Sequence, residues 1–318
     1  MPDSSTEERI AYGGQAVLEG VMMRSRSCVA TAVRHPAGQI VVRARPITTG
    51  RLAKALRRVP VLRGVAALWD ILLIGMRSLA FSDEVAIEDE SDQSDVEPAE
   101  SEGSGFVWAS LAFGLAIGVG LFFVLPIFVT RIADPSIGSD LLSNLLEGLV
   151  RLALLVAYLW IIGLLPDIRR TFEYHGAEHK TVNAVEAGDE LTVDNVMLHS
   201  STHPRCGTNF LLVVVVLSIL VFATLGRPDL PLRIGSRIAL VPLIAGLGFE
   251  LIRFLSMHRE NFLAAAVLRP GLWLQAITTR PPAPDQVEVA IVAMDQVLCA
   301  ESEERAAPPT TLHYVLRS

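Results

Sequence analysis

The sequence predicts a mainly α-helical, polytopic membrane protein with about four transmembrane helices and a small N-terminal β-containing cytosolic unit. Hydrophobic residues make up 51% of the 318 residues and charged residues only 19%. The mean hydropathy of +0.44 is too high for an ordinary soluble enzyme. Four long apolar runs recur between residues 106 and 258, and the segment before them is rich in β-branched residues and arginine.

Residues 1–58 form the expected β-containing unit. Two runs with many β-branched residues, Cys28 to Arg34 and Gln39 to Arg45, flank a turn-like stretch that contains Pro36 and Gly38. The glycines between residues 13 and 20 do not make a dinucleotide-binding fingerprint, so we interpret them as structural turns rather than as a ligand cradle. The N-terminus is polar, and no cleavable signal peptide is expected.

Residues 59–82 predict an interfacial amphipathic helix. Arg63, Asp70 and Arg77 recur every seven residues and place a charged stripe on one helix face. The longest apolar run in the segment, Ile71 to Met76, is far shorter than the roughly 20 residues that cross a bilayer. A helix lying at the membrane surface, or one packed on the membrane bundle with its charges paired, fits this pattern better than a span.

An acidic segment, residues 83–105, follows this helix. Aspartate, glutamate and serine dominate it and little of it is apolar, so we expect a disordered linker. The preceding eighty residues are rich in arginine, and this asymmetry behind the net charge of -7 argues against a general nucleic-acid binder. The three cysteines, Cys28, Cys206 and Cys299, are too few for a disulfide framework and suit a reducing compartment.

Residues 106–258 predict the four-helix membrane domain. The apolar runs place spans at about 106–130, 145–165, 210–225 and 238–255. In the last span Glu250 and Arg253 could pair, either inside the bundle or toward a site. With four spans, both termini and the loop 166–208 share one side, and basic residues place that side in the cytoplasm. Residues 259–318 then form C-terminal cytosolic helices and a tail.

The loop between the second and third spans carries a pattern that suits chemistry. His175, Glu178 and His179 would share one helix face, because positions three and four apart are neighbours. The order H-x-x-E-H occurs in inverted zincins, where two imidazoles bind Zn²⁺ and the glutamate handles a proton. A solvated helix with two surface histidines is the competing interpretation of these residues.

A second pair of ligand types, His203 and Cys206, follows in a loop built around proline and glycine. The two motif histidines with Cys206 would leave a coordination position open, as catalytic zinc sites do. With His203 as a fourth ligand the site would be closed and structural, and the sequence does not decide between these alternatives. Glu178 is the favoured general base, and Glu173 is a second catalytic candidate that could orient an imidazole.

Several motifs also occur in an order that resembles a known family; they are Gly13 to Arg24, Arg63-Gly64, Glu173 to Lys180, His203 to Thr208 and Pro270 to Gln275. They resemble the bacterial DUF1385 family of YqhQ-like, predicted metal-dependent membrane enzymes. The resemblance runs from about Gly13 to Val297. It implies a multi-pass protein of the bacterial inner membrane that binds a metal, and it names no reaction.

The leading hypothesis is a membrane-embedded, metal-dependent hydrolase at the cytosolic membrane interface, with Zn²⁺ or another divalent metal as cofactor. The expected partners are the lipid bilayer and, as substrate, a lipid head group or a juxtamembrane peptide. Nucleic acid is not expected, and a homo-oligomer stays open. The rival hypothesis is a non-enzymatic scaffold or adaptor with a structural zinc site. A transporter is weaker, because the spans hold few polar residues and no inverted repeat.

Overall fold

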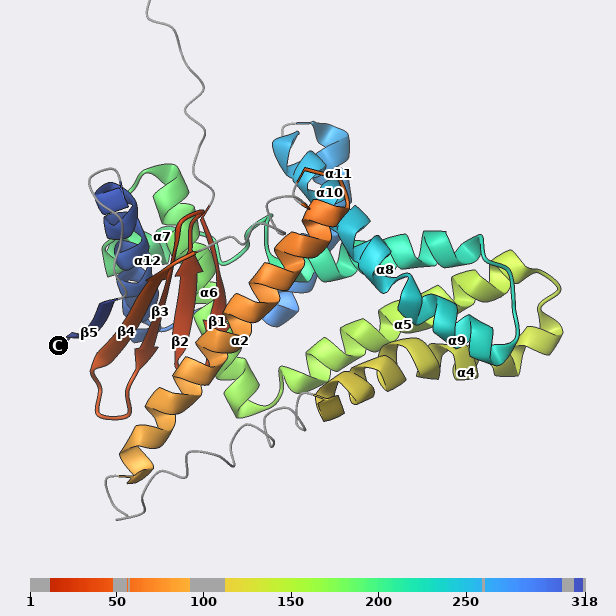
Figure 1. Ribbon diagram of the computed structural model, residues 1–318, viewed down its shortest axis with the longest axis horizontal. Coiled ribbons are helices and arrows are strands. Elements are labelled where there is room, and N and C mark those ends of the chain that lie inside the picture. Colours follow the sequence, from red (N-terminus) through yellow and green to blue (C-terminus); the bar gives the residue numbers. More distant parts are fainter. Residues whose placement is uncertain are drawn as a thin grey trace, which may run out of the picture.

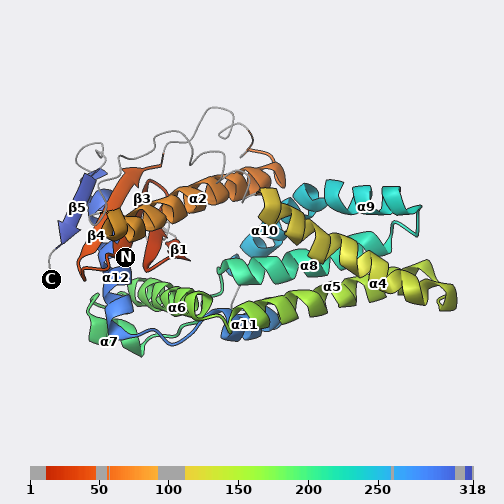
Figure 2. The ribbon, with the colours of Figure 1, turned by 90° about the horizontal axis from the view of Figure 1, so that it is seen from below.

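The computed structural model describes residues 12–47, 56, 58–91, 112–258, 261–304 and 312–316. It is mainly helical, with one antiparallel sheet at one end and a bundle of long helices at the other (Figures 1 and 2). Helix α6 (Pro166–Ala187) lies between these two parts. The fold class agrees with the expectation, and membrane insertion itself stays a prediction.

Five strands form the sheet, in the order β1-β2-β3-β4-β5, and every neighbouring pair is antiparallel. They are β1 (Gly13–Val17), β2 (Gly20–Arg24), β3 (Cys28–Arg34), β4 (Ile40–Pro46) and β5 (Leu312–Leu316). The predicted hairpin is confirmed as β3 and β4, whose pairing ends at Arg34 opposite Ile40. Strand β5 comes from the C-terminal tail and pairs with β4, which sequence reasoning did not foresee.

Helices α6 and α12 (Pro284–Glu304) pack with the sheet around the largest buried cluster. Tyr174 of α6 and Met294 of α12 are both fully buried there with Val21 and Val42 of the strands. Apolar side chains on alternate strand positions therefore meet apolar helix positions. This core fixes α6, the helix of the H-x-x-E-H motif, against the sheet.

Helix α2 (Leu62–Ser91) corrects two expectations. It continues nine residues into the expected linker, because Phe81 and Val85 are buried against the sheet and Glu84 pairs with Arg43. The remainder of that linker, residues 92–105, lies outside the described residues. The segment Leu62–Ala86 is also long and apolar enough to cross a membrane, contrary to the expectation drawn from its short uncharged run.

The bundle contains three further helical segments that are long and apolar enough to span a membrane: Ala112–Ser136, Asp140–Ile162 and Leu230–Met257. They correspond to the first, second and fourth spans expected from the sequence. The third expected span is α8 (Gly207–Ala223), a shorter apolar helix of 17 residues. Four candidate spans are thus found among the described residues, as many as expected. They differ from the expected four in that α2 is included and α8 is not.

These segments are built from several elements. The first contains the π-helix η1 (Gly120–Val124), α4 (Leu125–Ala133) and the 3-10 turn η2 (Asp134–Ser136), the second is α5 (Asp140–Ile162), and the last is α9 (Leu230–Ala239) with α10 (Val241–Met257). The end of α5 and the beginning of α8 lie at the end of the bundle next to α6 (Figure 1). Glu250 of α10 accepts hydrogen bonds from Arg63 of α2 rather than from the expected partner Arg253.

Two more helices complete the surroundings of α6. Helix α7 (Val193–Leu198) packs on α6, and α11 (Phe262–Thr278) packs on α8 and ends beside the first turn of α8. Gly188 ends α6 in the left-handed region with φ of 81°, a conformation that glycine adopts without strain. The loop between α7 and α8 and the end of α11 are thereby brought to one face of α6.

Candidate metal centre

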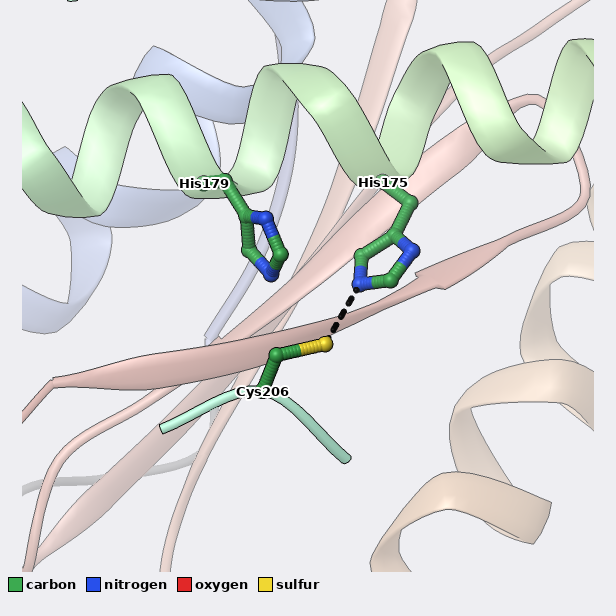
Figure 3. Close-up of side chains that lie close together, drawn as sticks. All are labelled: His175, His179 and Cys206. Atoms are coloured by element: carbon green, nitrogen blue, oxygen red, sulfur yellow. Dashed lines mark hydrogen bonds between the residues drawn. The ribbon is translucent and has the colours of Figure 1, made fainter. Parts of the chain in front are cut away.

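Three ligand side chains converge where the bundle meets α6. His175 and His179 project from the same face of α6, and Cys206 approaches them from the start of α8 (Figure 3). Their ligand atoms all lie within 4.8 Å of one another, and the Cys206 sulfur is 3.3 Å from Nε2 of His175. Of the ligands predicted from the sequence, these three are brought together.

Each imidazole is held by a backbone carbonyl through its other nitrogen. Nδ1 of His175 lies 2.8 Å from the Thr278 carbonyl oxygen, and Nδ1 of His179 lies 2.7 Å from the Ser201 carbonyl oxygen. A carbonyl only accepts, so each Nδ1 carries the proton and each Nε2 keeps its lone pair. Metal-binding histidines are oriented by such a bond in most proteins. A solvated helix with two surface histidines would not need either contact.

The separations suit tetrahedral coordination. A nitrogen and a sulfur bound to one Zn²⁺ at about 2.0 and 2.3 Å lie about 3.5 Å apart. The 3.3 Å between His175 and Cys206 is close to this value. His179 and Cys206 are buried and His175 is half-buried, so the set is shielded yet reachable from the His175 side. Two imidazoles and one sulfur are the borderline-soft donors that Zn²⁺ prefers, so the residues present fit a zinc ion with one position left over.

Gly176 explains how the carbonyl of Thr278 reaches α6. A Cβ at this position would collide with the backbone carbonyl oxygen of Arg280. The chain after α11 therefore runs directly over the glycine, and the Arg280 backbone N–H donates to the Phe172 carbonyl at 2.9 Å. The glycine next to the first histidine thus serves close packing that orients that histidine.

A network of amides positions the loop that presents Cys206. Gln275, fully buried in α11, clamps His203: its Oε1 accepts from the His203 backbone N–H and its Nε2 donates to the His203 carbonyl, both at 2.9 Å. Asn209 donates to the Pro204 carbonyl at 2.8 Å. Gly271 leaves room for Asn209, because a Cβ there would overlap the Asn209 side chain. The motif Pro270 to Gln275 therefore supports the cysteine loop.

Glu178, the expected general base, lies beside the three ligands. Its Oε2 is 3.4 Å from Nε2 of His179, the nitrogen that faces the centre. The residue is 5% exposed, and β1 lies directly against it, since a Cβ on Gly14 would come within 2.8 Å of the Glu178 Cγ. Gly14 is therefore a strand residue that permits close approach, not the turn residue expected from the sequence.

His203, the fourth ligand candidate, faces a different partner. It is absent from the converging group, and its ring centre lies 5.9 Å from that of His179. Its Nε2 is 3.6 Å from Oε2 of Glu186, which also pairs with Arg205. Burial alone would raise the pKa of Glu186, but His203 and Arg205 outweigh it and hold that pKa below its usual value.

Glu173, the second catalytic candidate, lies away from the imidazole nitrogens. Its Oε2 accepts a hydrogen bond from Gln286 of α12 at 3.1 Å, and its Oε1 lies 3.7 Å from Arg169. The orienting role assigned to it is carried instead by the Thr278 and Ser201 carbonyls.

Sequence reasoning missed these carbonyls and Gln275. Any residue can supply a backbone carbonyl, so the sequence does not reveal which carbonyls accept. Gly176 and Gly271, each inside a motif, were nevertheless signals that another segment packs closely at these positions.

Comparison with known proteins gives one family and one curated relative. The model of the family described as "Protein of unknown function (DUF1385)" matches residues 59–300. "Uncharacterized protein YqhQ" of Bacillus subtilis (strain 168) is 34% identical over 308 residues, which cover 94% of this chain and 96% of the relative. No solved structure matches the chain significantly.

Proposed function

The chain belongs to the DUF1385 family, and we propose that it is a membrane-embedded, zinc-dependent hydrolase whose centre faces the cytosolic surface of the bilayer. One observation carries this proposal: two Nε2 lone pairs and one sulfur converge, with the carboxylate of Glu178 3.4 Å from one of those nitrogens. A metal held by three protein ligands next to a carboxylate is the arrangement of hydrolytic zinc enzymes.

The position of each residue suggests its role in hydrolysis. A bound divalent metal would lower the pKa of water and so supply a nucleophile near neutral pH. Glu178 would take the proton of the attacking water and later deliver it to the leaving group. The carbonyls of Thr278 and Ser201 keep the imidazoles in the ligating tautomer throughout. Burial of Cys206 and His179 excludes solvent from the inner side of the centre.

The substrate class follows from location. The centre lies where the helical bundle adjoins α6, beside the end of α5 and the start of α8 (Figure 1). If the bundle crosses the bilayer, this end lies at the membrane surface, so a lipid head group or a juxtamembrane peptide could reach it. Both classes contain an ester, phosphoester or amide bond that an activated water can cleave.

The first experiment measures metal and turnover together. Purified protein in nanodiscs should hold one zinc per chain, and Glu178→Gln should keep that zinc while turnover of a fluorogenic phospholipid or peptide falls by about 10²- to 10⁴-fold. His199→Gln is the matched control, since the His199 ring pairs with Asp189 and is not one of the converging ligands. Equal turnover in wild type and Glu178→Gln would remove the glutamate from the mechanism.

A second experiment separates an enzyme from a scaffold without a substrate. Co²⁺ in place of zinc gives a visible spectrum that reports coordination, and azide should change this spectrum if one position is available to an outside ligand. The scaffold hypothesis predicts a fourth protein ligand and a spectrum that azide leaves unchanged. In that case His203→Ala would alter the spectrum, whereas the three-ligand centre predicts little effect from this substitution.

A further inference from the structure

A second charged cluster lies inside the helical bundle, between side chains of α5 and α9. Glu147, Arg151, Arg233 and Arg237 form it, and we call these four residues the arginine core. Their side chains are 1%, 3%, 6% and 0% exposed, respectively. They come from α5 and from α9, the first part of Leu230–Met257, and both α5 and Leu230–Met257 are long and apolar enough to span a membrane. Charges so placed are expensive and usually functional.

Three guanidinium groups share a single carboxylate. Oε1 of Glu147 accepts from Nη2 of Arg151 at 2.9 Å and from Nε of Arg237 at 3.2 Å. Oε2 accepts from Nε and Nη2 of Arg233 at 3.1 and 2.9 Å. The acceptor capacity of Glu147 is therefore filled, and it neutralises only one of the three positive charges.

The charged residues around the arginine core do not neutralise its excess positive charge. Asp134 accepts from Arg233 at 3.1 Å, and Asp140 accepts from Arg227 at 2.5 Å at the rim of the cluster. With the rim included, four arginines face three carboxylates among the described residues. One positive charge is left over in a region of low dielectric, where an unbalanced ion is strongly disfavoured.

Within the arginine core, one N–H donor has no acceptor, and it belongs to Arg237. Its Nη1 is buried and has no hydrogen-bond partner within the described part of the chain, while Nη2 donates to Asn144 at 2.7 Å. The other two arginines use further acceptors: Arg151 Nε donates at 2.8 Å to the carbonyl of Phe122 within the π-helix η1. An unpaired charged N–H in the interior needs either a water or an anion.

We propose that the arginine core binds one small monovalent anion of the halide type at Nη1 of Arg237. A water would satisfy the hydrogen bond but would leave the surplus charge in place, whereas a halide does both. The ligand has to be small and to approach along the guanidinium edge, because the ring of Phe222 covers the guanidinium groups of Arg237 and Arg151 at 4.6 and 5.1 Å. The site holds together four helical segments, since Ser218 of α8 also accepts from Arg151.

Thermal unfolding of the whole protein in nanodiscs tests this inference. At constant ionic strength, replacing gluconate by chloride should raise the unfolding midpoint of the wild type saturably, by about 5 °C. The Arg237→Gln variant removes both the surplus charge and the free donor, so its midpoint should no longer respond to chloride. Arg227→Lys is the matched control: it alters the partly exposed rim but keeps the charge count and the free donor of Arg237, so the chloride response should remain.

The wild-type measurement decides the matter even if Arg237→Gln does not fold. A midpoint that is the same in chloride and in gluconate, or that rises linearly without saturation, would overturn the proposal. A chloride response of equal size in Arg237→Gln would also overturn it. None of these outcomes depends on the metal centre or on hydrolase activity.

Discussion

Nδ1 of His175 lies 2.8 Å from the carbonyl oxygen of Thr278, a residue 103 positions later in the chain. This bond joins the end of α11 to α6 and leaves Nε2 of His175 as the nitrogen that can bind a metal. The centre is therefore assembled by the packing of α6, α8 and α11, and substitutions that disturb this packing should affect metal binding without touching a ligand.

Gly176→Ala should weaken zinc binding by about 10- to 100-fold, the usual effect of losing the group that orients a ligand. An alanine normally stabilises a helix by about 1 kcal/mol relative to glycine. Here its Cβ would displace the backbone of Arg280, and with it the Thr278 carbonyl that holds His175. Competition with a chelator measures the affinity.

Gly235→Ala is the control for this prediction, because a Cβ in that exposed helical position meets nothing within 4 Å. It should leave zinc affinity unchanged. Wild-type affinity in Gly176→Ala would show that the segment after α11 can move away without disturbing His175.

Gln275→Leu should lower the stability of the fold by about 1–3 kcal/mol, because it leaves the buried backbone N–H of His203 without an acceptor and removes one of the two hydrogen bonds to the His203 carbonyl. The midpoint of thermal unfolding should fall, and zinc should bind more weakly because the Cys206 loop loses its clamp. Trp273→Leu, at a position 74% exposed on the same helix, provides the comparison and should change neither quantity much. An unchanged midpoint in Gln275→Leu would mean that water replaces the amide.

The side of the membrane on which the centre lies can be tested with a native cysteine. Cys299 on α12 is exposed, whereas Cys28 and Cys206 are buried. If α12 and the centre are cytosolic, a membrane-impermeant maleimide should label Cys299 in inside-out vesicles and not in intact cells. Asp229→Cys in a Cys299→Ser background places a thiol in the exposed turn before α9 and should show the opposite pattern. Labelling of Cys299 in intact cells would show that α12 lies on the outer side of the membrane, opposite to the expected topology.

The sequence predicted the chemistry of the centre better than its geometry. The two motif histidines and Cys206 could be found because helical spacing and residue type determine which atoms are able to bind a metal. His203 could not be separated from them, since only tertiary packing turns its Nε2 toward Glu186. The length of α2 was underestimated for a similar reason: Phe81 and Val85 continue the helix through contacts with a sheet that lies far earlier in the chain.

Glu186 makes the stability of the fold depend on pH. Despite burial, His203 and Arg205 hold the pKa of this carboxyl below its usual value of 4.5, so the folded state favours the ionised form more than the unfolded state does. Its contribution to stability is therefore complete above about pH 4.5 and is lost as the pH falls through the lower folded pKa. Glu186→Gln should reduce the unfolding midpoint at pH 7, and its difference from wild type should shrink in acid. The exposed Glu190, replaced by glutamine in the same way, should leave the midpoint near that of wild type at both pH values. A Glu186→Gln difference that stays constant from pH 7 to pH 3 would show that the carboxylate acts through packing and not through its charge.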